Sequence, residues 1–243
     1  MQPRASRLLP PGGCCGEHTL SGAGESGPGA GRSRRPSTYI AGAVLLVGLA
    51  VWAYVASTND RFPGDLKVST WIQSWRTDWL DMAFRAVSTA GVEYVAGAIV
   101  LLAAVALALA GRRCAAGLVV AATAVGFVLR TVLKLVVARP RPSDELVDVI
   151  ERADGYSFPS GHVMFYMVLL GTLWLVLTTG DASRRSRRAI SGATVLALLL
   201  IGLSRIYLGA HWLSDVAGGY AFGAVVVGFA ALAWRWWGVA RPG

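Results

Sequence analysis

Three short stretches of the sequence carry side chains that could transfer a phosphoryl group. The stretch SRIYLGAHWLSD, residues 204–215, places Arg205, His211 and Asp215 next to an apolar run. His211 and Asp215 are four residues apart, a spacing that predicts one helical face and a hydrogen bond between them. Such an aspartate fixes the imidazole tautomer and stabilises its cation, which leaves the other ring nitrogen free to attack. Arg205 adds a planar fork suited to phosphate oxygens.

The stretch FPSGH, residues 158–162, has the composition of a helix start. Ser160 is a favoured N-cap residue, Gly161 permits close approach of the backbone, and the free N–H groups of a helix start bind anions. A serine and a glycine before a helix are also common as a plain cap. His162 favours the catalytic interpretation, because a histidine beside an anion site can donate a proton near neutral pH.

The stretch KLVVARPRP, residues 134–142, supplies two more cations. Lys134 and Arg141 are seven residues apart, nearly two helical turns, but Pro140 and Pro142 predict that the helix ends before Arg141. Lys134 alone would be compatible with a side chain that reaches toward lipid headgroups. Together, two histidines, an aspartate, three cations and a Ser-Gly helix start favour phosphoryl transfer through a covalent histidine.

The elements that must position these residues are membrane helices. The 243 residues are 54% hydrophobic and only 15% charged, which favours a membrane protein. Six apolar stretches approach the roughly 20 residues that cross a bilayer, and they lie at 39–57, 91–110, 115–137, 162–179, 189–204 and 215–234. We therefore expect an all-α, polytopic bundle of six transmembrane helices over 38–238. Residues 1–37, rich in Gly, Pro, Ser and Arg, are expected to form a disordered cytoplasmic tail, and 239–243 a short C-terminal tail.

The basic residues predict the orientation of this bundle, because short cytoplasmic loops carry the excess of Lys and Arg. With the first tail inside, the inner segments hold thirteen basic residues, including the short runs RR and RRSRR, and the outer segments hold eight. Both termini are then cytoplasmic, and the three stretches face outward. The net charge of +9 is explained by this pattern, so no nucleic-acid partner is expected.

Other features are consistent with a membrane surface. Trp71, Trp75 and Trp79 recur every four residues, which predicts three indoles along one stripe of an interfacial helix, with gating of lipid entry as a second interpretation. The acidic loop 142–156 is expected to be a solvated cover without the ligand spacing of a metal site. Arg130, one turn before Lys134, is expected to pair inside the bundle.

The three stretches, in this order and with this internal spacing, resemble the signature motifs of the type 2 phosphatidic acid phosphatase superfamily. The resemblance covers residues 134–215, and membrane members of that family also have six spans with the motifs outside. It implies that His211 is the nucleophile, that Asp215 supports it and that His162 protonates the leaving group. It implies no metal or other cofactor, and phosphate ligands at Lys134, Arg141, Ser160, Gly161 and Arg205. Arg139 also precedes a proline, and only the spacing from Lys134 selects Arg141.

The expected function is that of an integral membrane phosphatase for a lipid phosphomonoester or diphosphate. Phosphatidic acid, phosphatidylglycerol phosphate and polyprenyl diphosphates all qualify, and the phosphate-binding residues do not choose among them. Two other classes stay open. Vanadate-dependent haloperoxidases resemble this family at the same residues, although six spans argue against them and halide oxidation would discriminate. A non-catalytic lipid transporter or binder would use the buried cations and histidines along a translocation path. The sequence indicates no oligomeric state.

Overall fold

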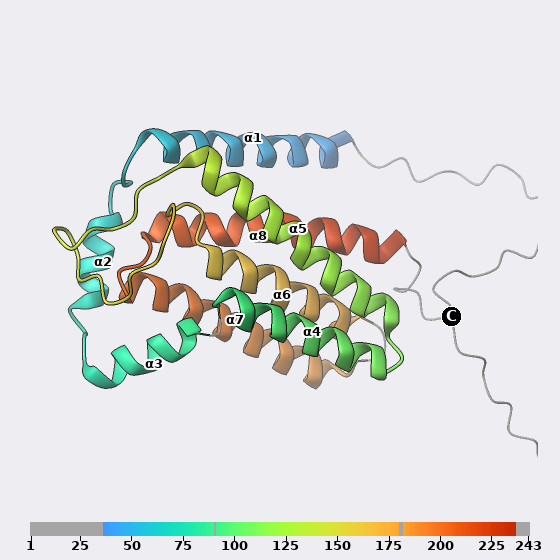
Figure 1. Ribbon diagram of the computed structural model, residues 1–243. Coiled ribbons are helices and arrows are strands. Elements are labelled where there is room, and N and C mark those ends of the chain that lie inside the picture. Colours follow the sequence, from blue (N-terminus) through green and yellow to red (C-terminus); the bar gives the residue numbers. More distant parts are fainter. Residues whose placement is uncertain (1–35, 90, 180–181, 237–243) are drawn as a thin grey trace, which may run out of the picture.

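The computed structural model describes residues 36–89, 91–179 and 182–236. These residues form helices and no strand (Figure 1). The helices are α1 (Pro36–Thr58), α2 (Asp65–Gln73), α3 (Asp78–Thr89), α4 (Glu93–Leu109), α5 (Arg113–Val137), α6 (Gly161–Thr178), α7 (Arg184–Tyr207) and α8 (Leu213–Trp236). All but two residues of the predicted tail at 1–37, and the whole of the tail at 239–243, lie outside the described residues.

The described helices are those of a multi-pass membrane protein, which confirms the predicted all-α bundle. Five of them, namely α1, α5, α6, α7 and α8, are individually long and apolar enough to cross a bilayer. The span predicted at 91–110 differs, because α4 has 17 residues and reaches only about 26 Å at 1.5 Å per residue. It meets the criterion only together with α3, from which it is bent by 63°. A turn closed by hydrogen bonds from the Gly91 and Val92 N–H groups to Ser88 O and Thr89 O separates the two helices.

Helix α7 begins earlier than predicted. The run RRSRR, which the sequence suggests is a loop, forms the first turns of α7. Ser183 is the N-cap, and its hydroxyl accepts a hydrogen bond from the Ser186 N–H group at 3.1 Å. Arginine side chains at such a position can extend to the headgroups while their stems stay in apolar surroundings, which makes the helix compatible with the charges.

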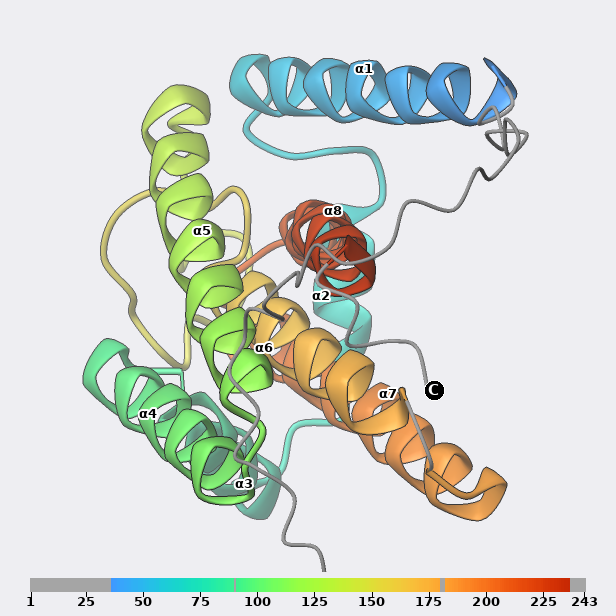
Figure 2. The ribbon, with the colours of Figure 1, turned by 90° about the vertical axis from the view of Figure 1, so that its right-hand side faces the viewer.

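Helix α6 lies at the centre of the bundle, where it packs against α5, α7 and α8 (Figure 2). Small residues allow the close contact between α6 and α8. A Cβ added to Gly171 of α6 would lie 2.8 Å from Val227 Cγ2, and one added to Gly223 of α8 would lie 2.8 Å from Met167 Cβ. Glycines at membrane-helix interfaces permit this approach of two backbones. The starts of α6 and α8 are thereby held side by side.

The predicted tryptophan stripe is interrupted. Trp71 lies in α2, Trp75 lies in the connection, and Trp79 lies in α3, so a single interfacial helix is wrong for this segment. Helix α2 ends at Gln73, whose side chain donates to Asp148 O and Tyr207 O. Acidic residues in the first turn of α3 favour a new helix start there. The three indoles are 53–65% exposed, as an interfacial position requires.

The two ends of the bundle hold different loops and helix ends. The loops 138–160 and 208–212, together with α2 and α3, gather at one end (Figure 1). The α4–α5 turn with Arg112, the start of α7 and the end of α8 lie at the opposite end (Figure 1). The three sequence stretches are therefore at one end, and the arginine-rich turns are at the other.

Candidate active site

All eight residues selected from the sequence lie at the same end of the bundle. They come from the end of α5, the loop 138–160, the start of α6, the end of α7 and the region around the start of α8. Backbone hydrogen bonds tie these pieces together. The Ser160 N–H group donates to Asp215 O at 3.0 Å, and the His211 N–H group donates to Arg205 O at 3.2 Å. The residues predicted to act together are thus brought together by α6, α7 and α8.

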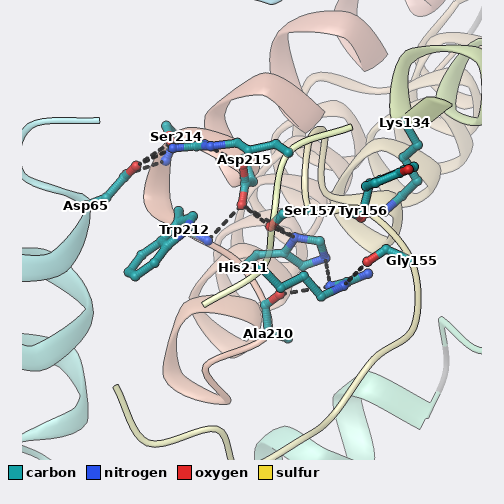
Figure 3. Close-up of polar contacts among 12 residues, drawn as sticks. Asp65, Lys134, Gly155, Tyr156, Ser157, Ala210, His211, Trp212, Ser214 and Asp215 are labelled. Carbon is teal, nitrogen blue, oxygen red and sulfur yellow. Dashed lines mark hydrogen bonds and ion pairs between the residues drawn. The ribbon is translucent and has the colours of Figure 1, made fainter. Parts of the chain in front are cut away.

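His211 is held so that its two ring nitrogens face different partners. The residue is 2% exposed and lies in the loop before α8, not on the helix, so the predicted shared helical face is wrong. Its Nδ1 is 3.7 Å from Asp215 Oδ2, too far for the predicted direct hydrogen bond, and 3.4 Å from Ser157 Oγ. Figure 3 shows Ser157 between the two side chains. Ser157 donates to Asp215, so its oxygen can accept from a protonated Nδ1.

Arg141 faces the other nitrogen of the nucleophile candidate. Its Nη1 lies 3.2 Å from His211 Nε2, and a guanidinium can only donate, so Nε2 carries the lone pair. The same guanidinium donates to Gly155 O at 2.9 Å, Asp154 O at 2.9 Å and Ala210 O at 2.8 Å. These bonds fix Arg141 between two loops. The neutral ring is therefore a Nδ1–H tautomer with its free pair directed at a cation.

Arg139, the other arginine before a proline, has a different place. It is 1% exposed, and its guanidinium lies 2.6 Å from Asp215 Oδ1 and 3.1 Å from Asp65 Oδ2. It also donates to Ser214 Oγ at 2.8 Å. The chain Asp65–Arg139–Asp215 is a buried ionic network whose charges are paired on both sides of the arginine. Arg139 thus orients the aspartate, while Arg141 contacts the histidine.

The guanidinium of Arg205 is paired with a carboxylate at the position where phosphate oxygens are expected to bind. It is 1% exposed, and its Nη1 and Nη2 are each 3.3 Å from Glu151 Oε1. Nη1 also donates to Ser88 Oγ, and this hydroxyl donates to Glu151 at 2.6 Å. Within the described residues, Arg205 Nε is buried without a hydrogen-bond partner. The acidic loop is therefore not wholly solvated, since Glu151 reaches inward to the cation.

The start of α6 forms a second wall of the site. The first intrahelical bond runs from Met164 N to Ser160 O at 3.0 Å, so the N–H groups of the first turn have no acceptor within the helix. Ser160 Oγ is buried without a partner among the described residues, and it makes no cap hydrogen bond. A helix start with spare donors suits an oxyanion. His162 Nε2 lies 3.0 Å from Ser88 O, which can only accept, so Nε2 carries a hydrogen.

Lys134 lies in the last turn of α5 and donates through Nζ to Tyr156 O. The helix ends at Val137, and Ala138 has a φ of 49°, so the chain turns before Arg141 as the two prolines predict. The turn allows both cations to reach the loop 154–156, one from each side.

Burial lowers the pKa of His211 well below its ordinary value, and the nearby Arg141 cation lowers it further. A lowered pKa means that the ring stays neutral as the pH falls through the ordinary histidine range near 6.5. A neutral imidazole keeps its nucleophilic lone pair, so the environment favours attack over protonation.

Comparison with known proteins identifies the family of this chain. A match to the PAP2 superfamily covers residues 115–239, which are 125 of the 243 residues and contain all three sequence stretches. The chain belongs to the PAP2 superfamily. Phosphatidylglycerophosphatase B of Bacillus subtilis (strain 168) is 34% identical over 102 residues, 40% of this chain and 47% of that protein. The chain thus matches about half the length of this curated relative.

Two solved structures share the fold of this PAP2 protein. The transmembrane PAP2-type phosphatidylglycerolphosphate phosphatase from Bacillus subtilis has a TM-score of 0.69 at 20% identity, with 79% of this chain and 94% of that chain covered. LpxE of Aquifex aeolicus has a TM-score of 0.58 at 24% identity, with 70% and 96% covered. The similarity extends to the helix bundle as a whole.

Several residues at the candidate site were not selected from the sequence. Asp65 and Ser88 lie before the matched region, and Ser157 and Glu151 lie in the loop ahead of α6. Local patterns mark them poorly, because each acts on a partner that is distant in the chain: Asp65 contacts Ser214, which is 149 residues away. A weak signal exists for Asp65, which follows a Pro-Gly turn and opens α2.

Proposed function

We propose that this protein is a membrane phosphatase that removes a phosphate from a lipid through a phosphohistidine on His211, without a metal ion. The observation that carries the proposal is the orientation of that ring. Nδ1 faces Ser157 and Asp215, and Nε2 directs its lone pair at Arg141, where a phosphoryl group would be held. This is the arrangement of a supported nucleophile next to an anion site.

In the first step, His211 Nε2 attacks phosphorus, a P–N bond forms, and the bond from phosphorus to the leaving oxygen breaks. The positive charge on the ring is stabilised by Asp215. His162, as the imidazolium with a hydrogen on both ring nitrogens, donates its Nε2 proton to the leaving oxygen, which replaces Ser88 O as the acceptor, and becomes a neutral imidazole. The lipid alcohol, or a lipid phosphate, then departs. Glu151 must leave Arg205 so that phosphate oxygens can bind there.

The negative charge of the transition state is distributed over three equatorial oxygens. Lys134, Arg141 and Arg205 provide fixed positive charge around them, and the α6 start adds backbone donors. These groups take the role that metal ions have in other phosphoryl-transfer enzymes. In the second step, water attacks phosphorus, His162 accepts its proton, the P–N bond breaks, and inorganic phosphate is released.

Removal of divalent metal tests the metal-free part of the proposal. Purified protein in detergent should release phosphate from a lipid phosphate at an unchanged rate in excess chelator, because the protein's own cations bind the oxygens. Vanadate should inhibit, since it adopts the five-coordinate geometry of the transferred group. A magnesium-dependent phosphatase assayed in parallel shows that the chelator is effective. Loss of activity that added magnesium restores would contradict the mechanism.

The distribution of basic residues supports an outward-facing site with both termini in the cytoplasm. Arginines lie in the turns at one end of the bundle, and the candidate site lies at the other. A reporter fused after Gly243 should therefore be cytoplasmic, and one inserted next to Asp148 should be external. Both fusions must retain phosphatase activity for the comparison to be valid. The reverse result would place the site on the cytoplasmic side.

A further inference from the structure

Arg130 lies beside the candidate phosphate site but belongs to none of the three sequence stretches. It is one helical turn before Lys134 on α5, and its side chain is 19% exposed. A Cβ added to Gly161 would lie 3.2 Å from both Arg130 Cδ and Nη1. The guanidinium therefore rests on the first residue of α6, at the edge of the helix start that is proposed to bind phosphate.

The guanidinium of Arg130 has hydrogen-bonding capacity to spare. Nη2 is 3.0 Å from Glu93 Oε1, and the Glu93 side chain is 74% exposed. Nε is buried without a hydrogen-bond partner among the described residues. The guanidinium carbon lies 4.7 Å from the centroid of the Phe127 ring, which supports one face of the group. Such a group can bind a second anion in a fixed orientation.

An apolar groove reaches Arg130 from within the membrane-spanning part of the bundle. Its volume is about 290 Å³, and its lining residues come mainly from α4, α5 and α6. Side chains such as Val100, Val120 and Phe165 line it, and Arg130 and Glu93 lie at its polar end. From Val120 to Arg130 the lining extends over about 15 Å of helix. An alkyl or prenyl chain fits these surroundings by its chemistry.

Gly91 connects the groove to the proposed general acid. It lines the groove, and a Cβ added to it would overlap the His162 ring. The leaving group must lie at His162, because that residue supplies its proton. The apolar chain of the leaving group is then adjacent to the groove, and the polar part between chain and reacting phosphorus is adjacent to Arg130.

We propose that Arg130 binds a second phosphate, one that stays on the leaving group, and that the groove takes the apolar chain attached to it. The inference rests on the proposed function and narrows its substrate class. A lipid diphosphate and a phosphatidylglycerol phosphate both leave a phosphate on the departing lipid, whereas phosphatidic acid leaves an uncharged diacylglycerol. Only the first two provide an anion for Arg130 in place of Glu93.

Arg130→Gln, which keeps a polar side chain but removes the guanidinium and its charge, tests the anion site. The kcat/KM values for a polyprenyl diphosphate, phosphatidylglycerol phosphate and phosphatidic acid are compared in the same detergent. We expect a loss of about 10- to 100-fold for at least one of the two lipids with a second phosphate, the size of one charge-assisted interaction, and little change for phosphatidic acid. A larger loss of kcat/KM on the diphosphate would mean that Arg130 binds the phosphate directly attached to the reacting one. A larger loss on phosphatidylglycerol phosphate would mean that it binds the phosphate on the other side of the glycerol.

Equal loss on all three lipids, or no loss on any, would overturn the inference while leaving the phosphatase function intact. Absence of phosphate release by the unmodified protein from every lipid would overturn the proposed function and the inference with it.

Glu93→Gln provides a second test that keeps Arg130 in place. It removes the competing carboxylate, so the KM for the lipids with a second phosphate should fall. A KM that rises as much as in Arg130→Gln would mean that the pair is structural.

Two substitutions test whether the groove binds the lipid chain. Ala124 lines the groove on α5, and Ala124→Phe should lower kcat/KM for long-chain lipids but not for a water-soluble phosphomonoester. Val125 is 57% exposed and is not among the lining residues, so Val125→Phe is a control of the same size on the same helix. Equal effects of the two substitutions would contradict chain binding in the groove.

Discussion

Replacing His211 with alanine should lower turnover by several orders of magnitude with every substrate. The substitution removes the nucleophile, so no phosphoryl-enzyme can form, and removal of a catalytic nucleophile in a protease costs ~10⁶-fold. Phosphate release by purified protein in detergent measures the effect. Labelled phosphate in reactions quenched with alkali, where phosphohistidine persists, should be found on the unmodified protein and be absent from His211→Ala.

The sequence offers a matched control, because His18 is the one histidine outside the three stretches. His18→Ala should keep full activity. The thermal unfolding midpoint of His211→Ala in detergent shows whether the fold is kept, since the ring is buried. Near-normal turnover in His211→Ala, or labelled phosphate on residue 162, would show that the roles assigned to the two histidines are wrong.

Replacing His162 with alanine should have a smaller effect that depends on the substrate. The residue supplies a proton to the leaving oxygen, and loss of a general acid costs about 10²- to 10⁴-fold. A lipid alkoxide is a poor leaving group and needs this proton. Nitrophenolate, or the phosphate that leaves from a diphosphate, needs it much less. We therefore expect a large loss of kcat on phosphatidic acid and a smaller one on nitrophenyl phosphate.

This pattern separates proton donation from a structural role. His162 contacts the Ser88 carbonyl, so its loss could also loosen the α3–α4 junction. Ser88→Ala keeps that carbonyl and removes only the hydroxyl that contacts Arg205, so it should affect both substrate types equally. If His162→Ala were equally slow on good and poor leaving groups, proton donation would be contradicted. The phosphohistidine on His211 should still be detectable in this variant with the better leaving groups.

The chemistry was readable from the sequence because its parts are local. A helix start needs residues in a row, and the support of His211 by Asp215 spans four positions. Membrane spans are equally local, because about 20 apolar residues in succession have one stable environment. Five predicted spans agree with helices that are long enough to cross a bilayer singly, and the sixth differs because α4 has only 17 residues and meets the criterion only together with α3.

The four-residue spacing of His211 and Asp215 did not predict how the nucleophile is supported. The hydroxyl of Ser157 lies between His211 and Asp215, and a residue 54 positions before the histidine cannot be recognised from a four-residue interval. The spacing from Lys134 selected Arg141 over Arg139, but it did not predict which side chain each arginine contacts. Arg141 contacts the imidazole and Arg139 contacts the aspartate because the chain turns at Ala138, and that turn directs the two side chains to different partners.

The sequence alone therefore indicated which residues are candidates for the chemistry and predicted that they lie at a membrane surface, since residue type and hydropathy are properties of short segments. The tertiary structure decided their charge environment. Asp65 joins Arg139 across 74 residues, Glu151 occupies Arg205 across 54, and Arg130 rests on Gly161 of the neighbouring helix. Electrostatic energy depends on distance in space and on burial, and only the packing of α5, α6, α7 and α8 sets those quantities.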